Sequence, residues 1–390
     1  MVHPLAEPSI LAEAAQRFGV DDPLEPEFAP AFRALLRALH EEARLSPAGL
    51  ERTRERLLRA LGRRVALARL EQAEPSVTSI AIERPIVVTG FPRTGTTLLH
   101  NLLARVEGLW APPLWQLRTP VAPLGLAPGP LQHWEQQQRE DTAALLDSVF
   151  AAAPGFQAIH PMDPSWPDEC NWLLRNCFST LANAFSWFIP GYVEFLRTCD
   201  MRPAYADHRR FMRALIHRRG DRPRLALKDP FHMWQVEALL AAYPDATIIW
   251  LHREPAQIVP SLASLCASLQ AIDTDSPRTQ AEIGRFALYI LGQGLRALEQ
   301  ARRTLPGEHF IDLPYRELVA SPGAVLRDLG ERLGFDAGTD ALEQAGRWLA
   351  QNRQHKLGRH RYSLEDFGLS EEVIEEYFGD YRGRFGALLD

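Results

Sequence analysis

Hydrophobic residues near the start of the chain recur at helical spacing. Between residues 30 and 70, leucines fall three or four positions apart, with arginine and glutamate between them: Leu35, Leu36, Leu39, Leu57, Leu58 and Leu61. This spacing predicts amphipathic helices. We therefore predict a helical N-terminal extension over residues 1–80. Gly62 lies too near the middle of its run to mark a helix end, and the pattern does not indicate what the extension does.

The hydrophobic pattern then changes to short, β-branched apolar runs followed by helical stretches. The predicted strands are Pro85–Thr89, Leu225–Leu227, Thr247–Leu251 and His309–Leu313. Helices are predicted from Thr97 to about Val106, from about His232 to Ala242, and from near Ser321. Strands that alternate with helices predict an α/β domain over residues 81–390, with a P-loop-like parallel sheet covered by helices on both faces.

Residues 107–220 show helical patterns without clear strands. We predict a helical substrate insertion over the carboxyl edge of the sheet, where open α/β folds bind their ligands. The segment is rich in aromatic residues: Trp110, Trp115, Trp134, Trp166, Trp172, Trp187, Phe178, Phe185, Phe188 and Tyr192. An aromatic wall suits a small hydrophobic or aromatic alcohol, and an ordinary core with large side chains explains the composition equally well.

The uncharged stretch Cys177–Val193 is short for a membrane span and contains Asn183, Pro190 and Gly191, so we expect it to be buried in the protein and expect no membrane span. The start of the chain lacks the pattern of a secretory signal, which favours a cytoplasmic protein. The four cysteines have no CxxC spacing, so we expect reduced thiols and no metal site. The net charge of -6 favours no nucleic-acid partner and leaves a local basic pocket open. The oligomeric state is not indicated, and a homodimer is compatible with the sequence.

The segment Gly90–Thr97 has the two-glycine frame of a P-loop, with Thr96 in place of the usual lysine. Backbone N–H groups and a helix N-terminus still favour a phosphate there. A triphosphate would lose its main charge support without the lysine. The loop therefore predicts a nucleotide that is not a triphosphate. A P-loop kinase of small molecules with a lysine from elsewhere, and a turn without a ligand, are the alternatives.

The stretch IVVTGFPRTGTTLLHNLL resembles the 5′-phosphosulfate loop of sulfotransferases that use 3′-phosphoadenosine-5′-phosphosulfate (PAPS), in a bacterial branch related to tyrosylprotein sulfotransferases. The resemblance covers roughly residues 85–110 and 222–370. It implies that the loop holds PAPS through Arg93, Thr94, Gly95, Thr96 and Thr97.

A second stretch, WLHREPAQIVPSLAS, resembles the family's 3′-phosphate motif and implies that Arg253 and Ser261 bind that phosphate. A fixed guanidinium at a strand end, followed by a helix start, suits a dianion. A surface ion pair with Glu254 is the alternative for Arg253.

The segment that begins with Lys228 resembles the KDPF segment of the same branch, which implies an ammonium that stabilises the leaving phosphate. By resemblance, Tyr315 lies near the adenine, and the loop with Lys356 and Gly358 closes over the phosphate end. A solvated lysine at a turn and a solvated basic loop are the alternatives.

The implied reaction moves a sulfuryl group to a hydroxyl by in-line displacement and needs a general base. Many relatives have an acidic residue where this chain has Gln116, which takes no proton at neutral pH. The candidate bases are His160, Glu169 and His232, of which we favour His232 or Glu169. A capping or packing role is the alternative for each, and a non-catalytic nucleotide-binding protein is the alternative for the whole chain.

Overall fold

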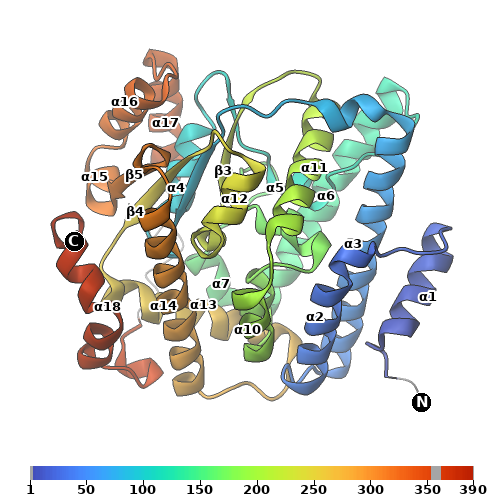
Figure 1. Ribbon diagram of the computed structural model, residues 1–390, viewed down its shortest axis with the longest axis horizontal. Helices are drawn as coiled ribbons and strands as arrows, with labels where there is room; N and C mark the ends of the chain where they lie inside the picture. Colours follow the sequence, from blue (N-terminus) through green and yellow to red (C-terminus); the bar gives the residue numbers. More distant parts are fainter. Residues whose placement is uncertain (1–2, 353–361, 390) are drawn as a thin grey trace.

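The centre of the molecule is a parallel sheet with the strand order β2-β3-β1-β4-β5 (Figure 1). The computed structural model describes residues 3–352 and 362–389. The strands are β1 (Ile86–Gly90), β2 (Leu109–Trp110), β3 (Arg224–Lys228), β4 (Thr247–His252) and β5 (Phe310–Pro314). The predicted parallel α/β sheet is confirmed. The expectation that residues 107–220 hold no strand is wrong at β2, because a strand of two residues has no recognisable alternation.

Alternate residues of the central strands supply the two faces of the sheet. Ile86 and Val88 of β1 pack on one face with α4 (Thr96–Leu103) and α16 (Pro322–Leu333). Val87 points to the opposite face, which α12 (Val236–Ala242), α13 (Pro255–Asp273) and α14 (Gln280–Thr304) cover. Side chains alternate in this way along any strand, so a sheet buried on both faces needs a continuous apolar run.

The remaining elements after β3 lie around this sheet. They are η4 (Pro230–Trp234), η5 (Gly307–His309), α15 (Tyr315–Ala320), α17 (Thr339–Gln351), η6 (Glu365–Phe367), α18 (Glu371–Phe385) and η7 (Gly386–Leu388). The helix expected from about His232 begins at Val236, because the residues before it form the 3-10 turn η4. Among the described residues, α13 has the length and apolar composition of a membrane span, and 56% of its most apolar window is buried inside the protein.

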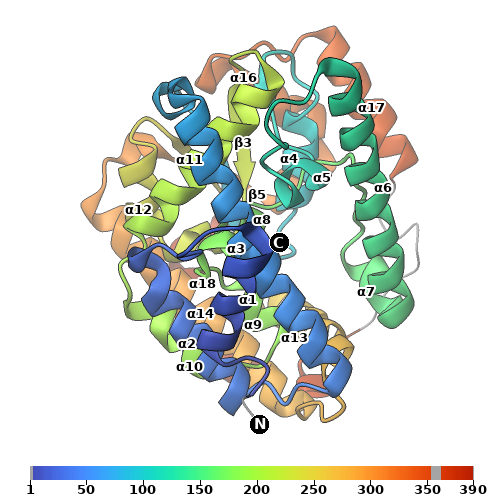
Figure 2. The ribbon, with the colours of Figure 1, turned by 90° about the vertical axis from the view of Figure 1, so that its right-hand side faces the viewer.

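The N-terminal residues form α1 (Glu7–Phe18), η1 (Pro26–Phe28), α2 (Ala29–Glu41), α3 (Pro47–Ala73) and η2 (Pro75–Ser79). These helices share one apolar core with the sheet face that carries Val87. Helix α3 continues through Gly62, where a Cβ atom would lie 2.5 Å from the Phe18 ring, so glycine permits the close approach of α1. The buried Arg64 of α3 pairs with Asp207 of the insertion at 2.7 Å. The extension is thus packed firmly onto the insertion (Figure 2).

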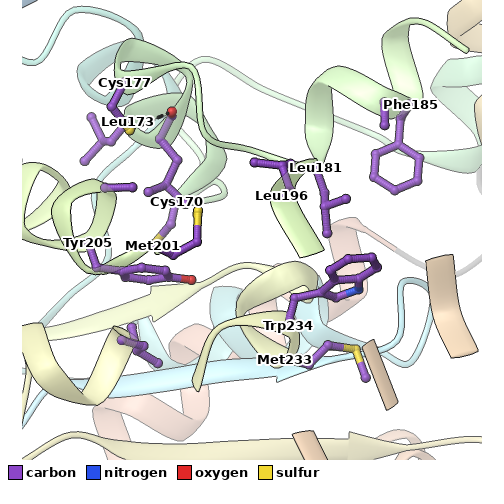
Figure 3. Close-up of a cluster of buried hydrophobic side chains, with 14 of the residues drawn as sticks. Cys170, Leu173, Cys177, Leu181, Phe185, Leu196, Met201, Tyr205, Met233 and Trp234 are labelled. Carbon is purple, nitrogen blue, oxygen red and sulfur yellow. Dashed lines mark hydrogen bonds between the residues drawn. The ribbon is translucent and has the colours of Figure 1, made fainter. Parts of the chain in front are cut away.

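The insertion consists of helices that follow one another along the chain, of which α6 and α11 are long and the others short. They are α5 (Leu114–Arg118), α6 (Pro128–Ala152), α7 (Pro154–Ile159), α8 (Asn171–Leu174), η3 (Arg175–Cys177), α9 (Ala182–Ser186), α10 (Pro190–Thr198) and α11 (Arg202–Arg219). The stretch from Cys177 to Val193 is mostly buried, as predicted. Figure 3 shows its side chains gathered with Met201 and Tyr205 above Met233 and Trp234 of η4.

Candidate functional site

The loop between β1 and α4 holds two glycines in conformations that other residues rarely adopt. Gly90 has φ +140°, and a Cβ atom there would lie 2.7 Å from the carbonyl oxygen of Leu251. Gly95 has φ +86° and immediately precedes the first residue of α4. The loop therefore folds back over the neighbouring strand β4 and leaves the N-terminus of α4 at the carboxyl edge of the sheet, which favours an anion.

The threonines of this loop have different surroundings. The amide and the hydroxyl of Thr94 both donate to the carbonyl oxygen of Phe91, at 3.3 and 2.7 Å. Thr94 thus closes the turn with its own donors and remains a predicted contact of PAPS. Thr96 and Thr97 form the first turn of α4, where backbone N–H groups have no partner within the helix.

Arg253 joins the end of β4 to the loop. Its Nη1 donates to the carbonyl oxygen of Arg93 at 2.8 Å, and its guanidinium lies 4.2 Å from the centroid of the Tyr315 ring. The Tyr315 ring also lies against Gly95, where a Cβ atom would approach it to 2.9 Å. Glu254 pairs with Arg382, so the alternative of an Arg253–Glu254 pair is not what the structure shows.

Ser261 lies in α13, which follows β4. Its side chain is fully buried, and its Oγ has no hydrogen-bond partner among the described residues. A buried hydroxyl without a partner is unfavourable. The ligand contact predicted for Ser261 would give this hydroxyl a partner.

Lys228 and Glu169 form an ion pair at the carboxyl end of β3. The Nζ–Oε1 distance is 2.8 Å, and the side chains are 1% and 17% exposed. The backbone N–H of Cys170 donates to the carbonyl oxygen of Lys228 at 2.9 Å, which fixes the insertion to the strand end. Nζ of Lys228 also lies 3.4 Å from Oγ1 of Thr97 in the first turn of α4. The loop has Thr96 where a P-loop usually has a lysine, and the ammonium of Lys228 lies beside the same helix start from the neighbouring strand.

The Glu169 carboxylate is oriented through both oxygens, because Nδ2 of Asn171 donates to Oε2 at 2.7 Å. Burial alone would raise the pKa of Glu169, but Lys228 and then His160 lower it below the usual value. Burial would likewise lower the pKa of Lys228, and Glu169 and Asp168 raise it. Both groups are therefore charged near neutral pH.

His160 caps the end of α7 beside this pair. Arg93 donates through Nη1 to the carbonyl oxygen of Ile159, the residue before it. Burial lowers the pKa of His160, whereas the negative charges of Glu169 and Asp168 oppose that effect. The structure thus brings Arg93, His160, Glu169 and Lys228 into one neighbourhood.

His232 has a different environment. Its ring is fully buried, and Nδ1 shares a hydrogen bond of 2.7 Å with the hydroxyl of Tyr205, which is itself buried. Burial is the main cause that lowers the pKa of His232 well below its usual value. Of the two bases favoured from the sequence, only Glu169 contacts Lys228 directly.

A model described as the sulfotransferase family matches residues 85–339, which is more than half of the chain. The chain belongs to the sulfotransferase family. It is therefore an enzyme of sulfuryl transfer, and its family typically uses PAPS as the sulfonate donor.

Three relatives of this sulfotransferase come from mycobacteria. The chain is 26% identical to the omega-hydroxy-beta-dihydromenaquinone-9 sulfotransferase Stf3 of Mycobacterium bovis over 316 residues, which are 79% of this chain and 76% of that protein. The crystal structure of sulfotransferase STF1 from Mycobacterium tuberculosis H37Rv matches with a TM-score of 0.82 at 28% identity, over 96% of this chain and 98% of that one. Sulfotransferase STF9 from Mycobacterium avium matches in fold, with a TM-score of 0.81 at 24% identity over 98% and 97% of the two chains.

The residues of this sulfotransferase fit a donor with phosphate at both ends. The partnerless hydroxyl of Ser261 and the guanidinium of Arg253 follow one strand, and the helix start at Thr96 and the ammonium of Lys228 lie at the next strands of the sheet. Lys356 and Gly358, which were predicted to close over the phosphate end, lie outside the described residues.

Three residues beside this site were not predicted from the sequence: Asp229, Asn171 and Arg175. Asn171 orients Glu169, and Arg175 lowers its pKa. Burial and then Glu169 raise the pKa of Asp229 to about 7, and its Oδ2 has no hydrogen-bond partner among the described residues. The carboxylates of the WPDEC segment are visible in the sequence, but only the fold shows that they meet the end of β3.

Most aromatic residues of the insertion belong to the core. Trp110, Trp115, Trp187, Phe178, Phe185 and Tyr192 are buried. Trp172 is partly exposed, lies three residues after Glu169, and donates from Nε1 to Oδ1 of Asp168 at 3.1 Å. The ordinary-core interpretation therefore holds for those six residues, and Trp172 is an aromatic surface beside the ion pair.

Proposed function

We propose that this sulfotransferase moves the sulfuryl group of PAPS to the hydroxyl of a small hydrophobic or aromatic molecule. The observation that supports the proposal is the pair of Lys228 and Glu169 at 2.8 Å, with the ammonium also directed at the first turn of α4. A base and a cation are thereby placed together at the helix start that suits the 5′-phosphosulfate.

In this proposal Arg253 and Ser261 bind the 3′-phosphate, and Arg93, Gly95, Thr96 and Thr97 bind the 5′-phosphosulfate. Tyr315 lies near the adenine. An arginine offers two parallel N–H donors to a phosphate, and the short hydroxyl of Ser261 completes its hydrogen bonds. These two groups distinguish a 3′-phosphorylated nucleotide from ATP.

The chemistry follows from the two charged groups. Glu169 takes the proton of the acceptor hydroxyl while the acceptor oxygen bonds to sulfur. The bond between sulfur and the bridging phosphate oxygen breaks on the opposite side, and Lys228 stabilises the negative charge that develops on that oxygen. As Lys228 turns to the leaving group, Glu169 loses part of its ion pair and becomes a stronger base.

We propose a hydrophobic acceptor because Trp172 offers an aromatic surface beside Glu169. The relative Stf3 is named for a hydroxylated menaquinone, which is a hydrophobic hydroxyl compound. We propose a cytoplasmic site of action, where the four cysteines, all of which are free, stay reduced.

The substitution Glu169→Gln tests the assignment of the base. Glutamine keeps an oxygen for Lys228 but takes no proton, so we expect kcat to fall by about 10²- to 10⁴-fold. The measurement is transfer of ³⁵S from labelled PAPS to a panel of phenols and primary alcohols. Binding of 3′-phosphoadenosine-5′-phosphate should stay unchanged. His160→Gln is the matched variant, and a loss of turnover in it alone would move the role of base to His160.

A further inference from the structure

One face of helix α3 carries a row of arginines. Arg52, Arg56, Arg59 and Arg63 are spaced by four, three and four residues, which places them on the same side of a helix. Asp273 pairs with Arg52 at 2.8 Å and with Arg56 at 2.6 Å. Glu55 pairs with Arg59 at 2.7 Å. Asp273 and Glu55 together therefore pair with three of the four arginines.

Arg63 is the member of this row without a carboxylate partner in the described part of the chain. The residues one turn away on α3 offer no carboxylate. Among the described residues, Arg63 makes one hydrogen bond, a long contact of 3.4 Å to Oδ1 of Asn176. The amide Nδ2 of Asn176 is buried and has no acceptor among the described residues. The guanidinium of Arg63 therefore lacks a carboxylate partner, and the amide Nδ2 of Asn176 beside it lacks an acceptor, among the described residues.

Two further arginines of the insertion approach Arg63 from other elements. Arg118 of α5 donates to Oγ1 of Thr142 at 2.7 Å, and Arg175 of η3 donates to Oδ1 of Asn171 at 3.3 Å. Neither forms an ion pair with a residue that the structure describes. Burial and the positive charges of Arg118, Arg59 and Arg175 lower the pKa of Arg63 to about 9. It stays charged at neutral pH, as arginine does in proteins.

These three side chains are partly exposed, yet burial is the main cause of the lowered pKa of each. We call these three side chains the arginine cluster. None of the three forms an ion pair with a described residue, although carboxylates act on two of them through their charge: Glu169, Asp229 and Asp168 on Arg175, and Asp141 on Arg118. By contrast, the exposed Arg332 pairs with Asp328 at 3.6 Å. Cations gathered in this way attract an anionic ligand.

The arginine cluster adjoins the proposed reaction centre through Arg175. Its positive charge is among the causes that lower the pKa of Glu169, and its guanidinium lies 4.9 Å from the centroid of the Trp172 ring. A molecule whose hydroxyl meets Glu169 can lie along Trp172 and extend toward Arg63 and Arg118. Helix α3 contacts η3, and α5 contacts α8, so the three arginines come from elements that adjoin one another.

We propose that Arg63, Arg118 and Arg175 bind an anionic group, a carboxylate or a phosphate monoester, at the end of the acceptor remote from its hydroxyl. The inference rests on the proposed function and makes the acceptor an amphiphilic hydroxy acid. It also gives the N-terminal extension a role, since α3 supplies one wall of the acceptor site.

The test is calorimetric titration of octyl phosphate, octanoate and 1-octanol into protein saturated with 3′-phosphoadenosine-5′-phosphate, so that the nucleotide site is already filled. We expect one or both anions to bind and 1-octanol to bind more weakly. Arg63→Gln and Arg118→Gln should each weaken anion binding by about tenfold, as expected for the loss of one charge-assisted hydrogen bond. Arg332→Gln is the matched control and should change nothing. The two anions separate a carboxylate site from a phosphate site.

Equal affinity for 1-octanol, or unchanged anion binding in both arginine variants, would overturn the inference. Affinity for 3′-phosphoadenosine-5′-phosphate is measured on the same samples and shows that each variant is folded. Loss of anion binding with intact nucleotide binding concerns the arginine cluster alone. Absence of nucleotide binding and of sulfuryl transfer in the wild type would instead contradict the proposed function.

Discussion

A lysine that is almost fully buried stays charged only when a partner offsets its desolvation. Lys228 has that partner in Glu169, and Glu169 has a second donor in Asn171. In the proposed mechanism, the pair holds a base and a cation in a mutually stabilising form until a bound ligand separates them. Removing either partner leaves the other buried and unpaired, which is why the conservative change to glutamine is the informative one.

The carboxyl group of Asp229, next to Lys228, makes the stability of the protein depend on pH. Burial and Glu169 raise its pKa to about 7, above the usual value of 3.8. The folded state therefore binds a proton that the unfolded state has already lost, so the free energy of unfolding falls as pH rises from about 4 to 7.

Asp229→Asn removes this dependence and keeps an oxygen for the backbone N–H of Phe231. We expect the variant to gain stability over the wild type as pH rises, by at most about 1.4 kcal/mol per pH unit, and to level off above pH ~7. Urea unfolding at several pH values measures the difference. Asp221→Asn, at an exposed position, is the control. A gain that does not vary with pH would contradict the raised pKa.

At the scale of elements, the ends of β1, β3, β4 and β5 each deliver one part of the proposed nucleotide site. Strand β1 leads into the phosphate loop, β3 ends at Lys228, β4 leads to Arg253, and β5 leads to Tyr315. Parallel strands bring their carboxyl ends to one edge, so four sequence segments that are far apart meet there. Helix α13 then carries Ser261 under the same edge.

Ser261→Ala separates the binding role of this hydroxyl from a structural one. Because Oγ of Ser261 has no partner among the described residues, its removal should leave the unfolding temperature of the free protein unchanged or slightly higher. Affinity for 3′-phosphoadenosine-5′-phosphate should fall by about tenfold. Thermal unfolding and calorimetry measure the two effects. Ser264→Ala, also buried on α13, should change neither, and a destabilised Ser261→Ala with intact binding would contradict the assignment.

At the scale of the whole molecule, the sequence predicted the sheet, because its strands are continuous apolar runs at regular positions. It also predicted the phosphate loop and Lys228, which directly follow those runs. It did not predict β2, which is too short to show a period. It also did not predict that Glu169 contacts Lys228 whereas His232 contacts Tyr205, because residue spacing does not determine which way a side chain points.

The contacts that the insertion makes with β3 and with α3 could not be predicted from the sequence either. The pairing of Glu169 with Lys228 joins positions 59 residues apart, and the approach of Arg63 to Asn176 joins positions 113 apart. Short helices joined by irregular turns give no rule for such contacts. The spacing of the leucines predicted the N-terminal helices, but their position against the insertion is visible only in the folded chain (Figure 2).

The central claim is that the site at the carboxyl edge of the sheet binds a 3′-phosphorylated nucleotide. Calorimetric titration of 3′-phosphoadenosine-5′-phosphate and of ATP, on the wild type and on Arg253→Ala, tests it most directly. We predict tight binding of the bisphosphate, weakened by about tenfold or more in Arg253→Ala, and much weaker binding of ATP. Binding of ATP as tight as that of the bisphosphate, with no effect of Arg253→Ala, would contradict the account and favour a kinase.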